Sequence, residues 1–172
     1  CSSDLILHES TVTKEQALEL YQKLKDYPVT FDIFADGGVY QERSRHNLIT
    51  QLGIPADHAA FMQRSRTPFD QSVEEFIDSV TTIERLGSYW SVSEGEKYQA
   101  LVADAVASVK GLSGTASMSM GMEILADGTS KGAALQWLCN YLGISTENAA
   151  AFGDSLNDVA MLSAAGMGTA VA

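Results

Sequence analysis

Apolar residues recur at intervals of three and four along three segments in the first two thirds of the chain. This spacing places them on one face of an α-helix, and Thr13 is a suitable N-cap for the first segment. A further short helix is expected just before Gly53 and Pro55, because glycine and proline commonly follow a helix end. The pattern therefore predicts helices over residues 13–24, 46–52, 71–80 and 94–109.

Two segments between these helices are rich in β-branched and aromatic residues. Residues 29–34 alternate in part between apolar and polar positions, and Asp36-Gly37 follows them. An Asp-Gly turn supplies the positive φ values that a tight hairpin needs, so a second strand is expected at Val39. Residues 81–92 predict a further strand. Strands and helices mixed in this way predict an α+β unit.

The pattern changes after residue 113. A small and methionine-rich stretch leads to the turn at Asp127-Gly128, and a helix follows that Gly143 can end. A strand over 148–152, a helix over 156–165 and a strand from Met167 come next. Helices and strands that alternate at short intervals are typical of a parallel α/β layer. We expect a boundary near Ser119, and the predicted parts are residues 1–10 as linker or core edge, 11–118 as the α+β unit and 119–172 as the α/β part.

Composition narrows the range of partners. The 172 residues include 22 acidic and 11 basic side chains, which give a formal net charge of −11. Nucleic acids and anionic membrane surfaces select for clustered lysine and arginine, so neither is expected as the main partner. No apolar run approaches the length of about 18 residues that spans a bilayer. Cys1 and Cys139 cannot form a disulfide scaffold, and this favours a reducing, cytoplasmic setting.

Three oxygen-bearing side chains cluster after the predicted strand that ends near residue 152. Asp154 stands where that strand turns into its helix, and Asn157 and Asp158 follow within one helical turn. Ligands of open α/β sheets bind at the carboxyl ends of strands, and Mg²⁺ prefers such oxygen ligands. The alternative is purely structural: Asp154 or Ser155 is a helix N-cap, and Asp158 balances the helix dipole.

Lys131 strengthens the functional interpretation. It lies in the first turn of its helix, where a cation opposes the helix dipole by about 0.3–1 kcal/mol. A residue that breaks a local rule is a candidate for function, here for holding an anion. One helix, a turn and a strand separate Lys131 from Asp154, so both can reach the same sheet edge. A solvated lysine is the alternative, but the combination of lysine, carboxylate and amide indicates phosphate chemistry.

Residues 130–132 (Ser-Lys-Gly) and 153–162 (Gly-Asp-Ser-Leu-Asn-Asp-Val-Ala-Met-Leu) closely resemble the third and fourth motifs of the haloacid dehalogenase-like (HAD) phosphatases. The order of the preceding elements resembles the Cof-like branch, which carries a large type IIB cap. The resemblance implies an α/β fold, with the C-terminal part of a Rossmann-like HAD core joined to an α+β cap domain.

The resemblance also implies roles for individual residues. Asp154 is the expected Mg²⁺ ligand, and Asp158 is expected to support either that metal or Lys131. Lys131 is expected to bind the transferring phosphoryl group and the nucleophile's carboxylate, and Asn157 to orient the phosphate. In the family an aspartate attacks phosphorus, and the aspartyl-phosphate is then hydrolysed. The expected substrate is a small phosphorylated metabolite, such as a sugar phosphate.

The chain departs from the family at its first motif, Asp-x-Asp, which supplies the nucleophile and the general acid. The aspartate pairs Asp32 and Asp36, and Asp154 and Asp158, are each four positions apart, so neither fits. We therefore expect a chain that is truncated at both ends, and that has no phosphatase turnover by itself.

Other functions remain open at the level of sequence. Phosphomutases and the phosphorylation domains of P-type ATPases use related motifs, and a non-catalytic binding protein of the same fold is a further alternative. Arginines in the cap segment suit bidentate recognition of an anionic or hydroxylated leaving group, but each is more simply part of a solvated face. They are Arg43, Arg45, Arg64, Arg66 and Arg85. The sequence gives no indication of the oligomeric state.

Overall fold

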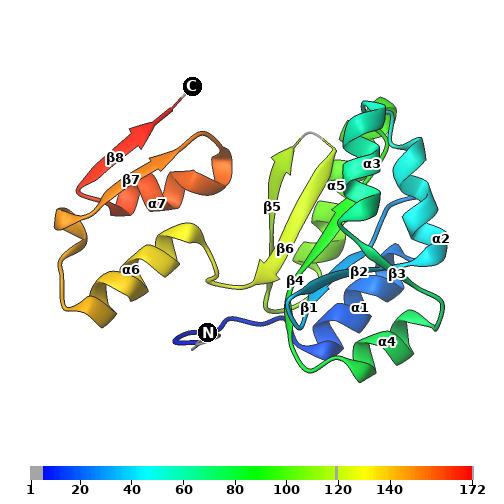
Figure 1. The fold of residues 1–172 in the computed structure, drawn as a ribbon, viewed down its shortest axis with the longest axis horizontal. Coiled ribbons are helices and arrows are strands. Elements are labelled where there is room, and N and C mark those ends of the chain that lie inside the picture. The colour runs from blue at the N-terminus through cyan, green and yellow to red at the C-terminus, as the bar shows by residue number, and fades with distance from the viewer. Residues whose placement is uncertain (1–5, 119, 172) are drawn as a thin grey trace. The chain divides into compact units, whose positions relative to one another are not determined.

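The chain forms two compact units in a computed structural model that describes residues 6–118 and 120–171 (Figure 1). Within the described residues, the first unit extends to Gly114 and includes Met118–Ala126. The second unit contains Thr115–Ser117 and the chain from Asp127 onward. The domain boundary predicted at Ser119 lies outside the described residues.

A six-stranded sheet forms the centre of the first unit. Its strand order is β3 (Thr67–Phe69), β2 (Gly38–Glu42), β1 (Asp32–Ala35), β4 (Ile83–Tyr89), β6 (Gly121–Ala126) and β5 (Leu112–Met118). Strands β2 and β3 are paired in parallel, whereas the pairs β1–β2, β1–β4 and β4–β6 are antiparallel. The predicted hairpin is confirmed: Asp36 and Gly37 have φ values of 48° and 76° between β1 and β2.

The helices of the first unit are α1 (Lys14–Leu24), α2 (Arg43–His46), α3 (Ala56–Arg64), α4 (Val73–Ser79) and α5 (Gly95–Ala107). The predicted cap of α1 is confirmed, because the Thr13 hydroxyl accepts from the amide of Gln16. The helix predicted over 46–52 is only partly confirmed. Residues Asn47–Gln51 form a 3-10 helix, in which the Thr50 hydroxyl donates to the Asn47 carbonyl and so competes with regular helical bonding.

Alternation along the central strands sorts apolar from polar residues. Ile33, Leu86 and Ile124 lie directly opposite one another on β1, β4 and β6, and all three are fully buried. They belong to one apolar cluster with residues of α1, α4 and α5. Asp32 and Glu123 occupy the neighbouring positions, which point to the other face of the sheet. The first unit therefore has a hydrophobic core of its own.

The second unit contains α6 (Lys131–Leu142), β7 (Ala150–Gly153), α7 (Val159–Ala164) and β8 (Met167–Ala170). The predicted parallel α/β arrangement is confirmed: β7 pairs in parallel with β8, and α6 contacts α7. Gly143, with a φ of 69°, ends α6 as expected. The helix predicted over 156–165 begins later than expected, because residues Leu156–Asp158 form a 3-10 turn ahead of α7.

Large apolar side chains of the second unit are exposed. Leu138 and Leu142, on the apolar face of α6, are 45% and 57% exposed, and Phe152 on β7 is 58% exposed. In the described part of the chain, the buried apolar residues of this unit are Cys139 and Ala151. No helix among the described residues is long and apolar enough to cross a membrane.

Candidate active site

Lys131 is the first residue of α6, as its motif predicts. The Ser130 hydroxyl caps this helix by accepting from the amide of Ala133 at 3.0 Å. The preceding turn contains Gly128, whose φ of 80° is a backbone conformation that glycine adopts without strain. The Lys131 side chain is half exposed. Its ammonium group therefore lies near the helix N-terminus, where an anion and not a cation is favoured.

Asp158 is the anion beside this lysine. Its Oδ1 lies 2.5 Å from the Lys131 Nζ, and its Oδ2 accepts from the amides of Asp154 and Ser155 at 3.1 Å each. The carboxylate is buried, with a side-chain exposure of 4%. The hydrogen bond from Lys131, followed by the bond from the Ser155 amide, lowers the pKa of Asp158 below its ordinary value. Asp158 is therefore held as a carboxylate, with both oxygens occupied.

Gly153 makes room for this arrangement. A Cβ atom at Gly153 would lie 2.7 Å from the Asp158 Oδ2 and still closer to its Cβ and Cγ. Real Cβ atoms essentially never show such distances. Gly153 is thus needed at the end of β7 so that the Asp158 carboxyl group can reach the backbone amides of Asp154 and Ser155.

Asp154 and Asn157 complete the group of four predicted residues. Asp154 follows β7 directly and is exposed, and its carboxylate forms no hydrogen bond or ion pair with another residue of the described chain. The Asn157 Oδ1 lies 3.4 Å from the Lys131 Nζ. The residue that caps the 3-10 turn is Ser155 and not Asp154. The structure therefore brings Lys131, Asn157 and Asp158 together and leaves the Asp154 carboxylate available.

The donor set fits a hard cation at Asp154. Mg²⁺ usually takes one or two protein carboxylates and completes its shell with waters and phosphate oxygens. Asp154 offers such a carboxylate, whereas both oxygens of Asp158 already accept hydrogen bonds. Among the described residues, no group of three or more histidine, cysteine, aspartate or glutamate side chains is placed to bind a metal. Among the described residues, the Asp154 carboxylate is therefore free to bind a metal directly.

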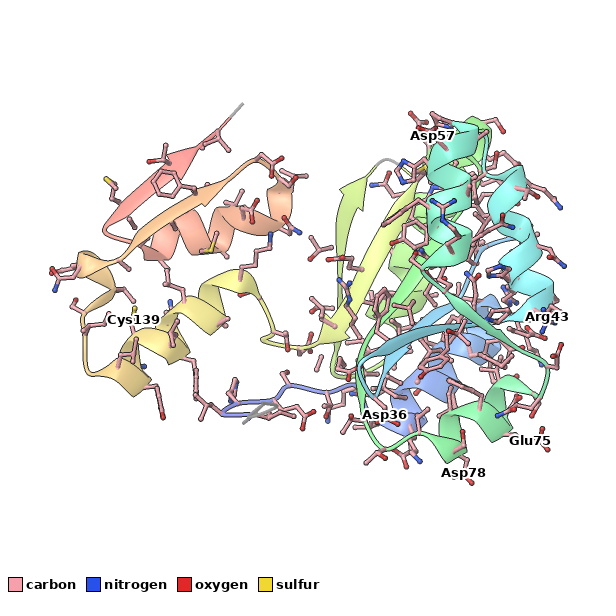
Figure 2. All side chains as sticks on the ribbon, in the orientation of Figure 1. Asp36, Arg43, Asp57, Glu75, Asp78 and Cys139 are labelled. Carbon is pink, nitrogen blue, oxygen red and sulfur yellow. The ribbon has the colours of Figure 1, made fainter. Side chains whose placement is uncertain are left out.

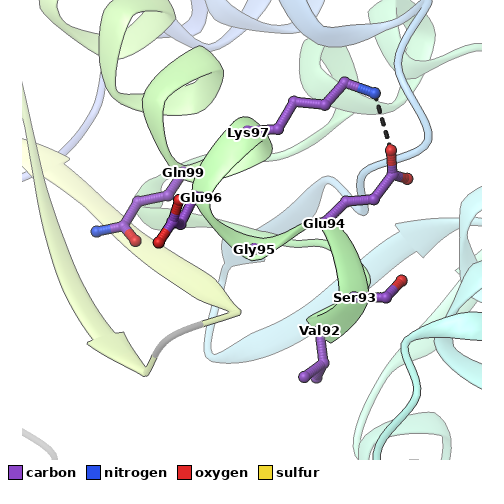
Figure 3. A pocket seen from close by; sticks show the side chains of 7 residues that line it. All are labelled: Val92, Ser93, Glu94, Gly95, Glu96, Lys97 and Gln99. Atoms are coloured by element: carbon purple, nitrogen blue, oxygen red, sulfur yellow. Dashed lines mark hydrogen bonds and ion pairs between the residues drawn. The ribbon is translucent and has the colours of Figure 1, made fainter.

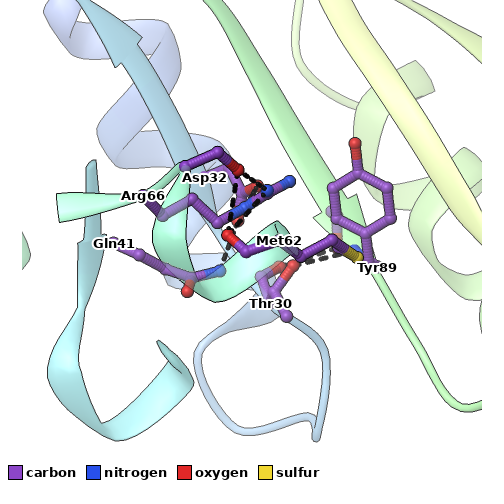
Figure 4. A network of polar contacts seen from close by, with 8 residues as sticks. Thr30, Asp32, Gln41, Met62, Arg66 and Tyr89 are labelled. Atoms are coloured by element: carbon purple, nitrogen blue, oxygen red, sulfur yellow. Dashed lines mark hydrogen bonds and ion pairs between the residues drawn. The ribbon is translucent and has the colours of Figure 1, made fainter. Parts of the chain in front are cut away.

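A polar network in the first unit lies outside the sequence-based prediction (Figure 4). Asp32 is fully buried on β1. Its carboxylate accepts from the Arg66 Nε at 2.6 Å and from the side-chain amide nitrogen of Gln41. The Arg66 guanidinium also lies over the ring of Tyr89, 5.4 Å from its centroid. Burial raises the pKa of Asp32, against the opposing effect of Arg66. This network joins the end of α3 to the sheet.

Two of the arginines expected on a solvated face are buried. One is Arg66, whose side chain is 8% exposed. The other is Arg45, which donates to four backbone carbonyls at and beyond the C-terminal end of α1. The expectation was wrong for both, because the acceptors come from distant segments that the sequence does not connect. Arg43, in contrast, is exposed and pairs with Asp70 at 2.5 Å (Figure 2). Cys139 on α6 is a free, buried thiol, as predicted (Figure 2).

A cavity of about 580 Å³ lies at the N-terminal end of α5 in the first unit (Figure 3). Glu94 and Lys97 form an ion pair of 2.9 Å across this end of the helix. None of the four motif residues lines it. The residues around it are Val92, Ser93, Glu94, Gly95, Glu96, Lys97 and Gln99. The strongest candidate for chemistry therefore stays in the second unit.

Comparisons with known proteins agree with the motif analysis. A family model for haloacid dehalogenase-like hydrolases matches residues 2–172. Phosphatase YwpJ of Bacillus subtilis is 26% identical over 192 residues, which cover 96% of this chain and 63% of YwpJ. The 5-amino-6-(5-phospho-D-ribitylamino)uracil phosphatase YcsE of the same organism is 32% identical over 152 residues, covering 83% of this chain and 60% of YcsE.

The fold agrees as well. A solved haloacid dehalogenase-like hydrolase from B. subtilis superposes with a TM-score of 0.76 at 24% identity, over 95% of this chain and 62% of that protein. The chain spans about three fifths of the length of these relatives. The resemblance inferred from the motifs is confirmed at the level of family and fold class. The match extends over almost the whole chain, and the chain therefore belongs to the haloacid dehalogenase-like hydrolases.

Proposed function

We propose that this chain is part of a phosphatase that hydrolyses a small phosphorylated metabolite, such as a sugar phosphate. The observation that supports this proposal most directly is the contact of Lys131 with Asp158, whose carboxylate also accepts from the backbone amide of Asp154. Both B. subtilis relatives are named phosphatases, and the name of YcsE specifies a phosphorylated ribityl compound. A substrate that carries a phosphorylated sugar or sugar alcohol is consistent with these names.

The proposed mechanism assigns each residue a separate task. The Lys131 ammonium group binds oxygens of the phosphoryl group, and Asp158 holds that ammonium group in place. The Asn157 amide nitrogen donates to a further phosphate oxygen, since the Asn157 Oδ1 already faces Lys131. Asp154 would hold Mg²⁺, and the ion would supply positive charge to the phosphoryl oxygens. Of the two roles expected for Asp158, this geometry favours support of Lys131 over binding of the metal.

The proposal requires a nucleophile from outside these residues. An aspartate carboxylate attacks phosphorus and the alcohol leaves, and water then hydrolyses the aspartyl-phosphate. No Asp-x-Asp pair occurs in the 172 residues. We therefore expect the chain alone to lack turnover. In this proposal the second unit is the C-terminal part of a catalytic core, and the first unit is the cap that selects the substrate.

The same proposal accounts for the exposed apolar residues of the second unit. Parallel sheets are usually buried on both faces, and two strands alone are marginally stable. We propose that further strands and helices of a complete core cover Phe152 and its apolar neighbours. A cytoplasmic setting and the absence of a nucleic-acid or membrane partner remain predictions from the composition.

A screen of phosphorylated metabolites with a protein of the relatives' full length tests this function. Release of inorganic phosphate in the presence of Mg²⁺ is the readout, and we expect the variants Lys131→Met and Asp154→Asn to lose at least about 100-fold in kcat/KM. Asp127→Asn is the matched control, because Asp127 is an exposed aspartate of the same unit. Wild-type activity in Asp154→Asn would refute the metal assignment. Binding of phosphorylated metabolites without turnover would instead indicate a non-catalytic binding protein.

A further inference from the structure

Gly132 lies where α6 closely approaches α7 in the second unit. A Cβ atom at this position would lie 2.7 Å from both the carbonyl carbon and the carbonyl oxygen of Ala160, and 3.0 Å from the Ala160 Cβ. Gly132 is buried in the first turn of α6, and Ala160 belongs to α7. Two of these three atoms belong to the backbone, so they cannot move aside as the end of a flexible side chain can. Any side chain at position 132 must therefore separate α6 from α7.

The two ends of the Lys131–Asp158 contact come from these same two elements. Lys131 immediately precedes Gly132 on α6, and Asp158 immediately precedes α7. The carboxylate of Asp158 is fixed to its own turn, because the amides of Asp154 and Ser155 both donate to its Oδ2. The Lys131 side chain is half exposed and is not held by packing in the same way. A change in the separation of α6 and α7 therefore moves the two partners of this contact relative to each other.

We propose that Gly132 is a positioning residue, whose contact with the backbone of Ala160 sets the distance between Lys131 and Asp158. Only one consequence of this inference rests on the proposed function: the phosphate group would bind to a lysine that is already held in place. The contact itself is a property of this chain and can be tested without turnover.

A merely structural role for Gly132 predicts a different result. Alanine is a better helix former than glycine by about 1 kcal/mol, so without the contact Gly132→Ala would stabilise α6. With the contact, both roles predict destabilisation. Only the positioning role predicts a change in the contact between Lys131 and Asp158, whose Nζ–Oδ1 distance is 2.5 Å. Separation of the helices lengthens that distance, and the protons of the ammonium group then exchange faster with water.

The experiment is ¹H–¹⁵N NMR of the Lys131 ammonium group in the 172-residue chain, which measures how fast its protons exchange with water. Asp158→Asn removes the charged partner and defines the exchange rate when the ion pair is lost, and Ala134→Ser is the control because Ala134 is exposed on the same helix. We expect Gly132→Ala to raise the exchange rate most of the way to the Asp158→Asn value, and Ala134→Ser to leave it unchanged. A folded Gly132→Ala variant with the wild-type exchange rate would overturn the inference.

Ala160→Val is a second variant, in case Gly132→Ala does not fold. It adds two methyl groups next to Gly132 from the side of α7, and it is expected to raise the exchange rate of the Lys131 ammonium protons in the same direction by a smaller amount. An unchanged exchange rate in a folded Ala160→Val variant would likewise overturn the inference. The result is independent of the proposed function: if the wild-type protein of full length lacks phosphatase activity but Gly132→Ala raises the exchange rate, the function fails and the positioning role stands.

Discussion

The two units of this chain are organised in opposite ways. The first unit buries large apolar side chains, such as Trp90, Phe31 and Leu86, in one continuous core. In the described residues of the second unit, apolar burial is confined to Cys139 and Ala151. The second unit nevertheless carries all four motif residues. The chemistry proposed for this chain is therefore located in the unit that has the weaker core.

This difference shows how the candidate site is held together. Its geometry comes from close local contacts: a helix cap at Ser130, two amides on the Asp158 carboxylate, and two glycines at points where a Cβ atom does not fit. None of these contacts requires a large apolar core around it. Local contacts fix the directions of side chains, whereas the burial of apolar surface supplies most of the stability. The second unit has these local contacts but buries little apolar surface.

Matched leucine truncations are expected to reveal the largest difference between the units. Leu86 in the first unit is fully buried, and Leu142 in the second is 57% exposed. Leu86→Ala leaves a cavity, so it should lower the free energy of unfolding of the first unit by about 2–5 kcal/mol. Leu142→Ala should change the free energy of unfolding by no more than about 0.5 kcal/mol.

Urea unfolding followed by tryptophan fluorescence measures the effect of Leu86→Ala. The chain has two tryptophans, Trp90 buried in the first unit and Trp137 on α6 in the second. A Trp137→Phe background leaves Trp90 as the single reporter of the first unit. Circular dichroism gives the effect of Leu142→Ala on the whole chain. Equal losses for the two leucines would mean that Leu142 is buried in solution.

Two neighbouring arginines allow a comparison of a buried polar contact with an exposed one within the first unit. Arg45 donates to the carbonyls of Val29 and Lys25 at 2.5 Å each, and Arg43 forms an exposed ion pair with Asp70. Arg45→Met removes the donors from buried acceptors and should cost about 1–3 kcal/mol in unfolding free energy. Arg43→Met should cost at most about 1 kcal/mol. Thermal unfolding of both variants gives the comparison, and a larger loss for Arg43→Met would contradict it.

Two buried aspartates, one in each unit, are expected to titrate in opposite directions from the ordinary aspartate pKa of about 3.9. Burial raises the pKa of Asp32 in the folded chain. Its contribution to the free energy of unfolding is therefore present below the pKa that Asp32 has in the unfolded chain, and it is lost as pH rises through the pKa in the folded chain. Lys131 and two backbone amides lower the pKa of Asp158 in the folded chain. Its contribution to the free energy of unfolding is therefore present above the pKa that Asp158 has in the unfolded chain, and it is lost as pH falls through the pKa in the folded chain.

Carboxyl-carbon NMR measures both of these pKa values in one titration of the chain. Arg66→Met is the informative variant for Asp32, since the loss of Arg66 should raise the pKa of Asp32 further. The expectation fails if Asp158 titrates at or above the ordinary aspartate value.

Local signals predicted much of the fold. The Thr13 cap, the Asp36-Gly37 hairpin and the Gly143 helix end each depend on neighbouring residues, and all three occur where expected. The spacing predicted that Lys131 and the residues around Asp154 reach the same sheet edge, and the family resemblance gave support of Lys131 as one of two roles for Asp158. The structure places Lys131 in contact with Asn157 and Asp158. The roles of Asp154 in metal binding and of Asn157 in phosphate binding remain predictions.

Features that depend on distant contacts were not predictable. Helix α3 and strand β3 have weak local patterns: α3 buries only Met62, and β3 has three residues including a proline. The burial of Arg45 and Arg66 depends on carbonyl and carboxylate partners at least 16 residues away along the chain. Gly132 and Gly153 could be identified as motif positions, but the atoms that exclude a Cβ there become visible only in three dimensions.

Native-state hydrogen exchange of the whole chain is the most direct test of the difference between the units. Strand β4 is paired on both sides, by β1 and β6, whereas β7 pairs with β8 alone among the described strands. We expect the amides of β4 to exchange roughly 100-fold or more slowly than those of β7. Equal protection of β4 and β7 would contradict the account, because the second unit would then have a stable core without any further chain.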